Sequence, residues 1–429
     1  MELVIRTAQG LIEGDVSKDG KTRIFKGVPY AEPPVGKLRF ARSVPKKPWI
    51  GVRTCKSFGP QAFQADKTKG DLYPKEFYSV EMPPMSEDCL YLNIWTPAEV
   101  NEKLPVLIYI HGGAYMHGYG SEATMDGEGM AKKNVIMVTI NYRVGALGFF
   151  AHDELEKENA EGISGNYGYW DQINALKWVY ENIEAFGGDK ERITISGQSA
   201  GCMSVQTLVS TDVTRGLIHG AILQSGGGIP GFARDYSLEH QKQVSLELME
   251  LLGAKNIEDL RNMSPENICY GAYEINGKHE GLMWMPNVDG YLLKDTVMNL
   301  ALDGKIHDIP YIIGSTKDEM GNGTAELLVE SARKFALNQE KLGKPPVYVY
   351  HFEHDLPGSD DGAFHSCELW YEFETLDRCW RPMTEHDYEI SEEMSTQFAN
   401  YVKKGNPNSD DVSEWKPFTE TDNFVMAYK

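Results

Sequence analysis

The sequence predicts an α/β protein with a mostly parallel central sheet and helices on both of its faces. One observation is a series of short apolar runs, such as 105–110 and 135–140, which are typical of strands covered on both sides. The other is helical spacing between such runs, as in 171–186, where Ile173, Leu176 and Val179 repeat along one face. Strands that alternate with helices in this way favour a layered α/β fold.

The other elements follow in chain order. Strands are expected at 3–5 and 11–13, as an N-terminal hairpin, and at 90–95, 221–224, 311–313 and 347–352; helices are expected at 200–209 and 391–403. The prolines of 27–40 imply an extended surface segment, and the polar stretch 62–86 is predicted to be a long loop. We expect 1–429 to be one domain, with cap insertions at about 229–309 and 320–346.

Composition bounds the function. The chain has 429 residues and a formal net charge of -21, which disfavours nucleic acid or an anionic membrane as a partner because phosphates bind clustered cations. Residues 1–15 lack a basic segment followed by an apolar run, and no apolar stretch reaches spanning length, so we expect a cytoplasmic protein. The six cysteines lack the spacing of zinc ligands, which favours free thiols and no structural metal.

The segment around Ser199 carries the strongest chemical signal. Ile193 to Ile195 is a short β-branched strand, and 197–201 has the sequence GQSAG. In such a G-x-S-x-G segment a strand turns sharply into a helix and exposes a serine at the apex, with glycines where bulk would not fit. The alternative is a glycine-flanked turn that buries an ordinary serine.

A second glycine-rich segment, HGGAY at 111–115, follows the apolar strand at 105–110. Small residues there allow backbone N–H groups to point at a ligand, which is how an oxyanion hole is made. The alternative is a plain glycine-rich turn between a strand and a helix.

A nucleophilic serine needs a base, and the base needs an acidic partner that orients it. The acid is expected after a later strand, where Asp318 and Glu319 both qualify. The histidine is expected after the next strand, where His354 and His365 lie. Position alone leaves both choices open.

Two long signatures resemble those of the type-B carboxylesterases, a family that includes cholinesterases and bacterial p-nitrobenzyl-type esterases. They are FGGDKERITISGQSAG around Ser199 and EDCLYLNIWTP at 87–97, and GVPYAEPPVGKLRF and KKGNPN extend the resemblance along the chain. The resemblance implies an α/β-hydrolase fold and a serine carboxylesterase that hydrolyses small or aryl esters through an acyl-enzyme. It implies a small-molecule ester as partner, with no cofactor and no metal.

The resemblance also assigns roles to residues. Ser199 maps to the nucleophile, Glu319 to the acid of a K-D-E loop, and His365 to the histidine of a G-x-x-H-x-x-E-L pattern. The oxyanion donors map to the backbone N–H groups of Gly113, Ala114 and Ala200, and Ser225 to a supporting serine beside the acid and the base. Candidate pocket walls, each of which could equally be core or cap packing, are Tyr115, Met116, Trp170, Phe232, Leu282 and Trp284.

The sequence departs from the family pattern in several places. Ala62 stands where secreted members have the cysteine that pairs with Cys89, so we expect no disulfide there. No tryptophan lies in 63–86, which argues against choline specificity. The stretch from Glu319 to His365 is shorter than in most relatives, which predicts a more open pocket.

The resemblance further suggests two ion pairs, Arg39 with Glu87 and Arg143 with Asp171. The alternative functions are an esterase that removes acetyl or feruloyl groups from plant polysaccharides and a non-catalytic family member. We expect a monomer, with a homodimer as the alternative.

Overall fold

The computed structural model describes residues 2–65, 72–78, 82–97, 99, 101–232, 236–321 and 323–429. The strands are β1 (Val4–Arg6), β2 (Leu11–Glu13), β3 (Asp15–Val16), β4 (Arg23–Pro29), β5 (Val52–Thr54), β6 (Tyr91–Thr96), β7 (Leu104–Ile110), β8 (Ile136–Ile140), β9 (Gly188–Gln198), β10 (Gly220–Gln224), β11 (Tyr236–Ser237), β12 (Asn287–Val288), β13 (Tyr311–Thr316), β14 (Val347–Phe352) and β15 (Met426–Tyr428). The α-helices are α1 (Leu72–Phe77), α2 (Glu128–Lys132), α3 (Gly145–Phe149), α4 (Asp153–Glu156), α5 (Tyr167–Asn182), α6 (Ala200–Leu208), α7 (Leu238–Leu252), α8 (Ile257–Asn262), α9 (Pro265–Lys278), α10 (Val297–Leu302), α11 (Thr324–Lys341), α12 (Leu369–Glu372) and α13 (Glu385–Lys404).

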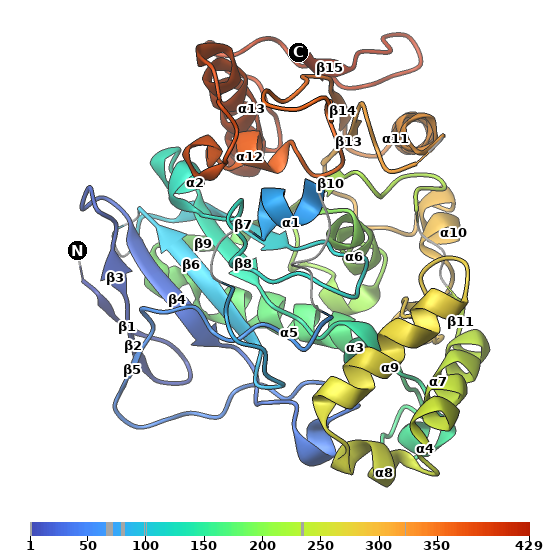
Figure 1. The fold of residues 1–429 in the computed structure, drawn as a ribbon. Coiled ribbons are helices and arrows are strands. Elements are labelled where there is room, and N and C mark those ends of the chain that lie inside the picture. Colours follow the sequence, from blue (N-terminus) through green and yellow to red (C-terminus); the bar gives the residue numbers. More distant parts are fainter. Residues whose placement is uncertain are drawn as a thin grey trace.

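A ten-stranded sheet forms the centre of the molecule, in the order β15-β14-β13-β10-β9-β7-β8-β6-β4-β3 (Figure 1). The strands from β15 to β8 are parallel, and β6, β4 and β3 add an antiparallel edge. The predicted mostly parallel α/β fold is therefore confirmed. Because β9 lies near the middle of the parallel part, its carboxyl end faces the crevice where such sheets bind ligands.

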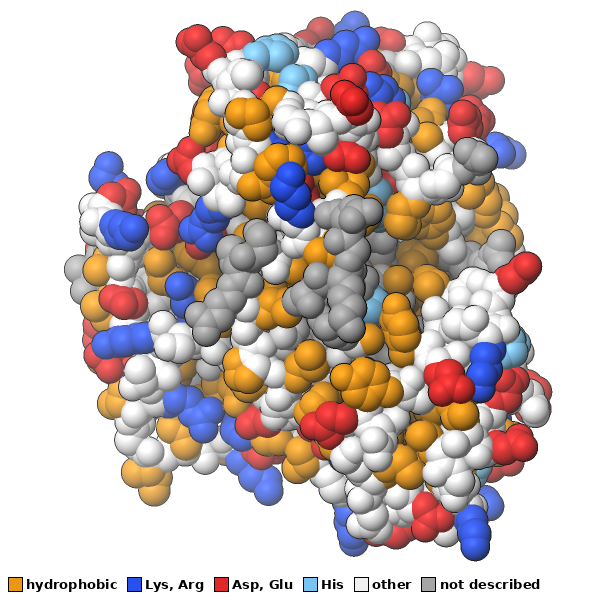
Figure 2. Space-filling view, in the orientation of Figure 1, with side chains coloured by type: hydrophobic (Ala, Val, Ile, Leu, Met, Phe, Trp, Pro, Cys, Tyr) orange, Lys and Arg blue, Asp and Glu red, His pale blue; other side chains and the backbone are white. Residues whose placement is uncertain are grey.

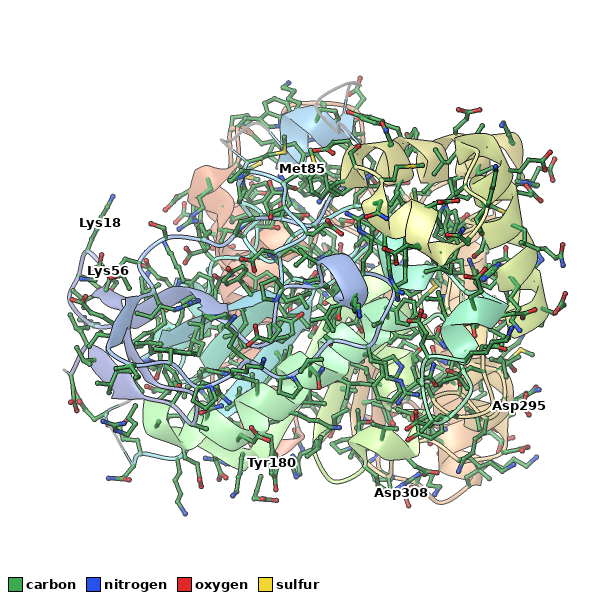
Figure 3. All side chains as sticks on the ribbon, turned by 90° about the horizontal axis from the view of Figure 1, so that it is seen from below. Lys18, Lys56, Met85, Tyr180, Asp295 and Asp308 are labelled. Carbon is green, nitrogen blue, oxygen red and sulfur yellow. The ribbon has the colours of Figure 1, made fainter. Side chains whose placement is uncertain are left out.

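The two faces of the sheet belong to different cores. On β7, Val106 and Ile108 join the apolar cluster that contains α5, α6 and α11, whereas Leu107 and Tyr109 join the cluster that contains α2, α12 and α13. This alternation explains the continuous apolar sequence of the strand, since both of its faces are buried. Seen from below, Tyr180 of α5 and Met85 near α1 lie on opposite sides of the molecule (Figure 3).

The predicted strands and helices are confirmed, with shifted ends. The closing helix α13 begins at Glu385 rather than 391, and β9 extends well before 193. The predicted loop 62–86 contains a helix, α1, that the sequence analysis missed. Its proline, Pro74, lies in the first turn, where a helix tolerates the missing N–H.

The segments expected as cap insertions differ in their packing. Helices α7, α8 and α9 form a block at one side of the sheet in Figure 1. Helix α11, which lies within the expected second insertion at 320–346, packs against β13 and β14 and covers the sheet. On the face shown in Figure 2, hydrophobic side chains gather around a hollow above the α7–α9 block.

Both expected ion pairs are present. Arg39 donates to both carboxylate oxygens of Glu87 at 2.6 Å. Arg143 donates from Nε and Nη2 to Asp171 at 2.7 and 2.8 Å, and both side chains are buried. Asp171 lies in α5, so the second pair fixes the helix that precedes β9.

All six cysteines lie within the described residues and are free, so no disulfide joins Cys89 to the region of Ala62. Among the described helices, none is both long and apolar enough to cross a lipid bilayer.

Arg143→Ala is expected to lower the free energy of unfolding by about 3–5 kcal/mol, because it leaves the buried Asp171 carboxylate uncompensated. Urea unfolding of wild type and variant measures the difference. Arg215→Ala is the matched control, since its pair with Asp212 is exposed and contributes about 0–1 kcal/mol. Equal losses in the two variants would contradict the role given to the buried pair.

Candidate active site

Ser199 lies at the turn between β9 and α6, with φ 57° and ψ -123°. A residue with a side chain in this region is strained by about 1–3 kcal/mol, so the surroundings must hold it there. Ser199 N–H donates to Gln224 O at 2.9 Å. A Cβ on Gly201 would lie 2.0 Å from Ile110 O, so only glycine lets α6 start directly against β7.

His365 and Glu319 meet beside this turn. Glu319 lies just after β13, and its Oε2 is hydrogen-bonded to His365 Nδ1. Its other oxygen accepts the Thr316 N–H at 3.0 Å. Both side chains are buried, and His365 lines the same pocket as Ser199. The buried carboxylate therefore fixes the orientation of the imidazole, in a pocket that Ser199 also lines.

The structure also places the alternatives that position alone left open. Asp318 accepts the Ala363 N–H at 2.9 Å, and nearly half of its side chain is exposed. His354 is hydrogen-bonded to Asp387 of α13 at 2.9 Å. Neither residue is among those that line the pocket of Ser199.

The pair shifts both ionisation equilibria toward charge separation. Burial by itself raises the pKa of Glu319, but His365, the Ser225 hydroxyl and the Thr316 N–H bring that pKa below its ordinary value. Burial lowers the pKa of His365, but the attraction of the neighbouring Glu319 carboxylate outweighs burial. The pKa of His365 is therefore raised above its ordinary value. The site therefore stabilises an imidazolium next to an ionised glutamate.

The glycine-rich segment lies directly beside the serine. Gly113 and Ala114 have φ of 101° and 56°, and both line the pocket with Ser199. A Cβ on Gly112 would lie 3.2 Å from Ser199 Cβ. Ala200 is the first residue of α6, where a backbone N–H has no partner within the helix. Small residues therefore bring the backbone of this segment close to Ser199.

Gln198 is a feature that the sequence analysis did not single out. Its side-chain nitrogen lies 3.1 Å from His365 Nε2. With the Nδ1 proton directed at Glu319, Nε2 is the accepting nitrogen and the Gln198 amide donates to it. This bond occupies the lone pair of Nε2, which is available to accept another proton only when the Gln198 amide moves away.

Two further buried carboxyl groups, Glu368 and Glu372, lie behind the pair. Ser225 Oγ lies 3.5 Å from Glu368 Oε1, and Gln224 Nε2 donates to Glu372 Oε2 at 2.7 Å. Burial raises the pKa of each to about 8, and Glu319 adds to the shift of Glu368. At neutral pH both are protonated, so Glu319 carries the negative charge of this cluster. Ser225 contacts both Glu319 and Glu368.

A pocket of about 300 Å³ opens at Ser199. Its walls come from α1 and the residue after it, the glycine-rich segment and the residues that follow it, the turn at Ser199, and the residues next to Glu319 and His365. They are Tyr73, Phe77, Tyr78, Gly112, Gly113, Ala114, Glu122, Met125, Gln198, Ser199, Met320, His365, Ser366 and Leu369. Within the described chain, no group of three or more His, Cys, Asp and Glu side chains could hold a metal ion.

The side chains predicted as pocket walls are not among those that line this pocket. Tyr115, Met116, Trp170 and Trp284 are buried in the apolar core, while Phe232 and Leu282 are only partly buried against it. Tyr115 follows Ala114 but turns away from the serine, and its hydroxyl is 2.6 Å from that of Tyr169. Proximity in sequence to the glycine-rich segment was therefore misleading. The (i, i+4) pair Tyr73 and Phe77 was the available signal for the actual wall.

Glu372→Gln is expected to stabilise the protein increasingly as pH rises. An unfolded glutamate ionises near pH 4.5, whereas folded Glu372 keeps its proton to about pH 8, so wild-type stability falls across this window. The glutamine keeps the bond to Gln224 and cannot ionise. The free energy of unfolding of the variant should exceed that of wild type by an amount that grows by up to about 1.4 kcal/mol per pH unit between pH 5 and 8. Urea unfolding measures this difference. The exposed Glu250→Gln is the control; a margin independent of pH would contradict the buried acid.

Comparisons with known proteins identify the family of the chain. The model of the carboxylesterase family matches residues 1–342 and 326–429. Para-nitrobenzyl esterase of Bacillus subtilis is 30% identical over 473 residues, covering 97% of this chain and 93% of the relative. Fumonisin B1 esterase of Sphingopyxis macrogoltabida is 34% identical over 339 residues, which cover 78% of this chain and 59% of that protein.

Solved structures give the same result. A PNB esterase structure superposes with a TM-score of 0.89 at 28% identity, covering all of this chain and 96% of the other. A Geobacillus stearothermophilus carboxylesterase superposes with a TM-score of 0.84 at 30% identity and the same coverage. The chain belongs to the carboxylesterase family and is a carboxylic ester hydrolase with the α/β-hydrolase fold.

Proposed function

We propose that the protein is a serine carboxylesterase in which Ser199 is the nucleophile, His365 the general base and Glu319 its orienting acid. The hydrogen bond between buried Glu319 and His365, in the pocket that also holds the strained Ser199, is the observation that carries the proposal. Membership of the carboxylesterase family supports it.

Each step of the reaction follows from these positions. Ser199 Oγ attacks the ester carbonyl while His365 Nε2 accepts its proton, and the backbone N–H groups of Gly113, Ala114 and Ala200 receive the oxyanion. His365 then protonates the departing alcohol, and a water molecule hydrolyses the acyl-enzyme by the same path in reverse. Glu319 balances the imidazolium in both halves, and Ser225 holds the acid in place.

The substrates we propose are small or aryl esters. A volume of about 300 Å³ lined by Tyr73, Phe77 and Tyr78 suits a compact, flat group. The name of the Bacillus subtilis relative, para-nitrobenzyl esterase, points to the same class. Acetyl or feruloyl groups of polysaccharides remain the alternative substrates. We further propose a cytoplasmic monomer.

Ser199→Ala is expected to lower kcat for p-nitrophenyl acetate and butyrate on the order of a millionfold, because the reaction loses its nucleophile. Initial rates of the two purified proteins test this. The exposed Ser413→Ala should keep wild-type rates, and circular dichroism should show both variants folded. A wild type inert on both esters, or a Ser199→Ala variant with full activity, would refute the proposal.

The pH dependence of kcat/KM is expected to rise through a pKa above 6.5, because His365 must be neutral to accept the proton and its pKa is raised. Glu319→Gln removes the charge responsible, so the acidic limb should move to lower pH while the rate falls by about ten-thousandfold. Stopped-flow or steady-state profiles from pH 5 to 9 measure both effects. An acidic limb that does not move in the variant would mean that Glu319 does not face His365 in solution.

A further inference from the structure

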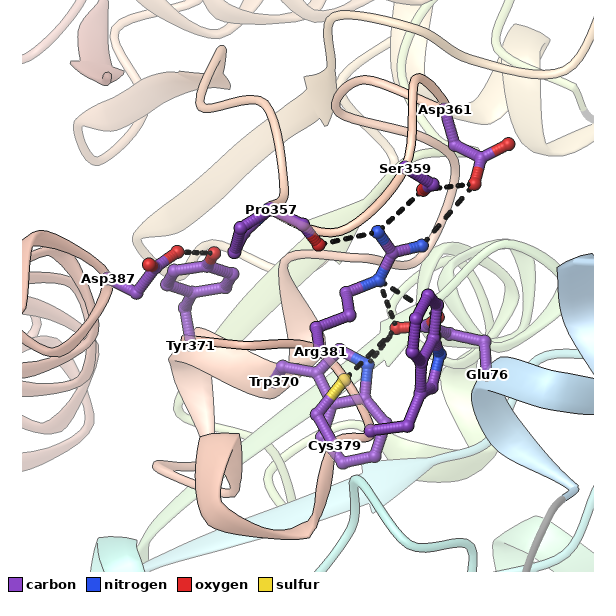
Figure 4. Close-up of polar contacts among 10 residues, drawn as sticks. Glu76, Pro357, Ser359, Asp361, Trp370, Tyr371, Cys379, Arg381 and Asp387 are labelled. Carbon is purple, nitrogen blue, oxygen red and sulfur yellow. Dashed lines mark hydrogen bonds and ion pairs between the residues drawn. The ribbon is translucent and has the colours of Figure 1, made fainter. Parts of the chain in front are cut away.

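Helix α1 is attached to the rest of the molecule through a buried carboxylate, Glu76. Its side chain is fully buried and accepts hydrogen bonds from Trp370 Nε1 at 2.9 Å and Trp380 Nε1 at 2.8 Å. Arg381 Nε donates to both of its oxygens, at 3.1 and 3.0 Å. Figure 4 shows this cluster, with the guanidinium of Arg381 between Glu76 and the loop at 357–361.

Arg381 connects the helix to the segment that carries the catalytic histidine. Beyond Glu76, its Nη1 donates to Pro357 O at 3.0 Å and to Ser359 Oγ at 2.8 Å. Both residues precede His365 in the chain, and Trp370 follows it in α12. The ion pair therefore ties α1 to the chain on both sides of His365.

Aromatic rings on and just after α1 form part of the pocket wall. Tyr73 and Phe77 of α1 and the adjacent Tyr78 all line the pocket. Tyr73 Oη donates to His365 O at 3.1 Å, and the Phe77 ring stacks on Trp370 with centroids 6.1 Å apart and planes at 13°. Since a helix of six residues is not stable alone, the position of these rings depends on the contacts that α1 makes with its neighbours.

We propose that Glu76 and Arg381 position α1 as the specificity-determining wall of the ester pocket, and that its aromatic rings favour substrates with an aryl group. The inference rests on the proposed esterase function and goes beyond it. A flat ring can pack offset or edge-on against Phe77, Tyr73 and Tyr78, whereas a short alkyl group leaves these contacts unmade. Neither Glu76 nor Arg381 touches the reacting atoms, so both are positioning residues.

Benzyl acetate and ethyl acetate provide the test, because their alcohols have similar acidity and differ by the phenyl ring. Arg381→Met leaves Glu76 buried without its cation, which should displace α1. The ratio of kcat/KM for benzyl over ethyl acetate should fall about tenfold, the contribution of one aromatic contact. Adding Glu76→Gln to this variant removes the stranded charge and should recover part of the ratio.

Arg39→Met is the matched control. Arg39 also holds a glutamate bidentately with little exposure, but neither Arg39 nor Glu87 lines the pocket. This variant should lose stability without changing the ratio. If Arg381→Met does not fold, Glu76→Ala replaces it, because Arg381 then keeps its bonds to Pro357, Ser359 and Asp361.

Amide hydrogen exchange of 72–78 gives a readout that does not depend on activity. Exchange in this segment should be faster in Arg381→Met than in wild type and Arg39→Met. A wild type inert on both esters would refute the esterase function, while the exchange would still test the attachment of α1. An unchanged benzyl-to-ethyl ratio in a folded, active variant, or unchanged protection of α1, would overturn the proposal.

Discussion

The strained backbone at Ser199 is the constraint on which the rest of the structure depends. Strain of about 1–3 kcal/mol persists only where neighbouring elements fix both ends of the turn. Here β9 is paired on both sides, with β7 and β10, and α6 starts against β7 with no side chain at Gly201 to separate them. The same contacts bring the Gly112 turn at the end of β7 beside the serine. One packing arrangement therefore sets the positions of both the serine and the glycine-rich backbone beside it.

The buried acids behind the site are organised around a single negative charge. Glu319, Glu368 and Glu372 are all buried, and ionising more than one of them would place like charges in a poorly solvated space. Glu319 has the hydrogen-bond donors and the imidazole that stabilise its charge, whereas Glu368 and Glu372 have elevated pKa values and stay neutral. As neutral acids they place no second negative charge beside His365. One fixed negative charge here balances one positive charge on His365, which is what the proposed mechanism requires.

The sequence predicted the sheet well because a buried parallel strand has little freedom in composition. Runs such as 105–110 and 311–313 are apolar throughout, and the strands there are confirmed. It could not choose between Asp318 and Glu319, since the side chains of adjacent residues point in different directions. Only the fold shows which carboxylate contacts the histidine. The family pattern selected Glu319. Helix α1 was missed because its proline and polar surroundings resemble a loop, and its stability comes from distant partners such as Arg381. The pocket walls were missed for the same reason.

Buried ion pairs of this kind specify geometry more than they add stability. The free-energy cost of removing two charges from water offsets much of the attraction between them. A protein with an apolar pair of similar volume would therefore often be as stable. A charge pair with several directional hydrogen bonds, however, fits only one arrangement, and Glu76 accepts from two indoles and a guanidinium. Because α1 is too short to be stable alone, these directional hydrogen bonds fix the positions of its rings relative to His365. The pocket therefore takes its shape from a site outside the reacting groups, which allows its selectivity to change while Ser199, His365 and Glu319 stay as they are.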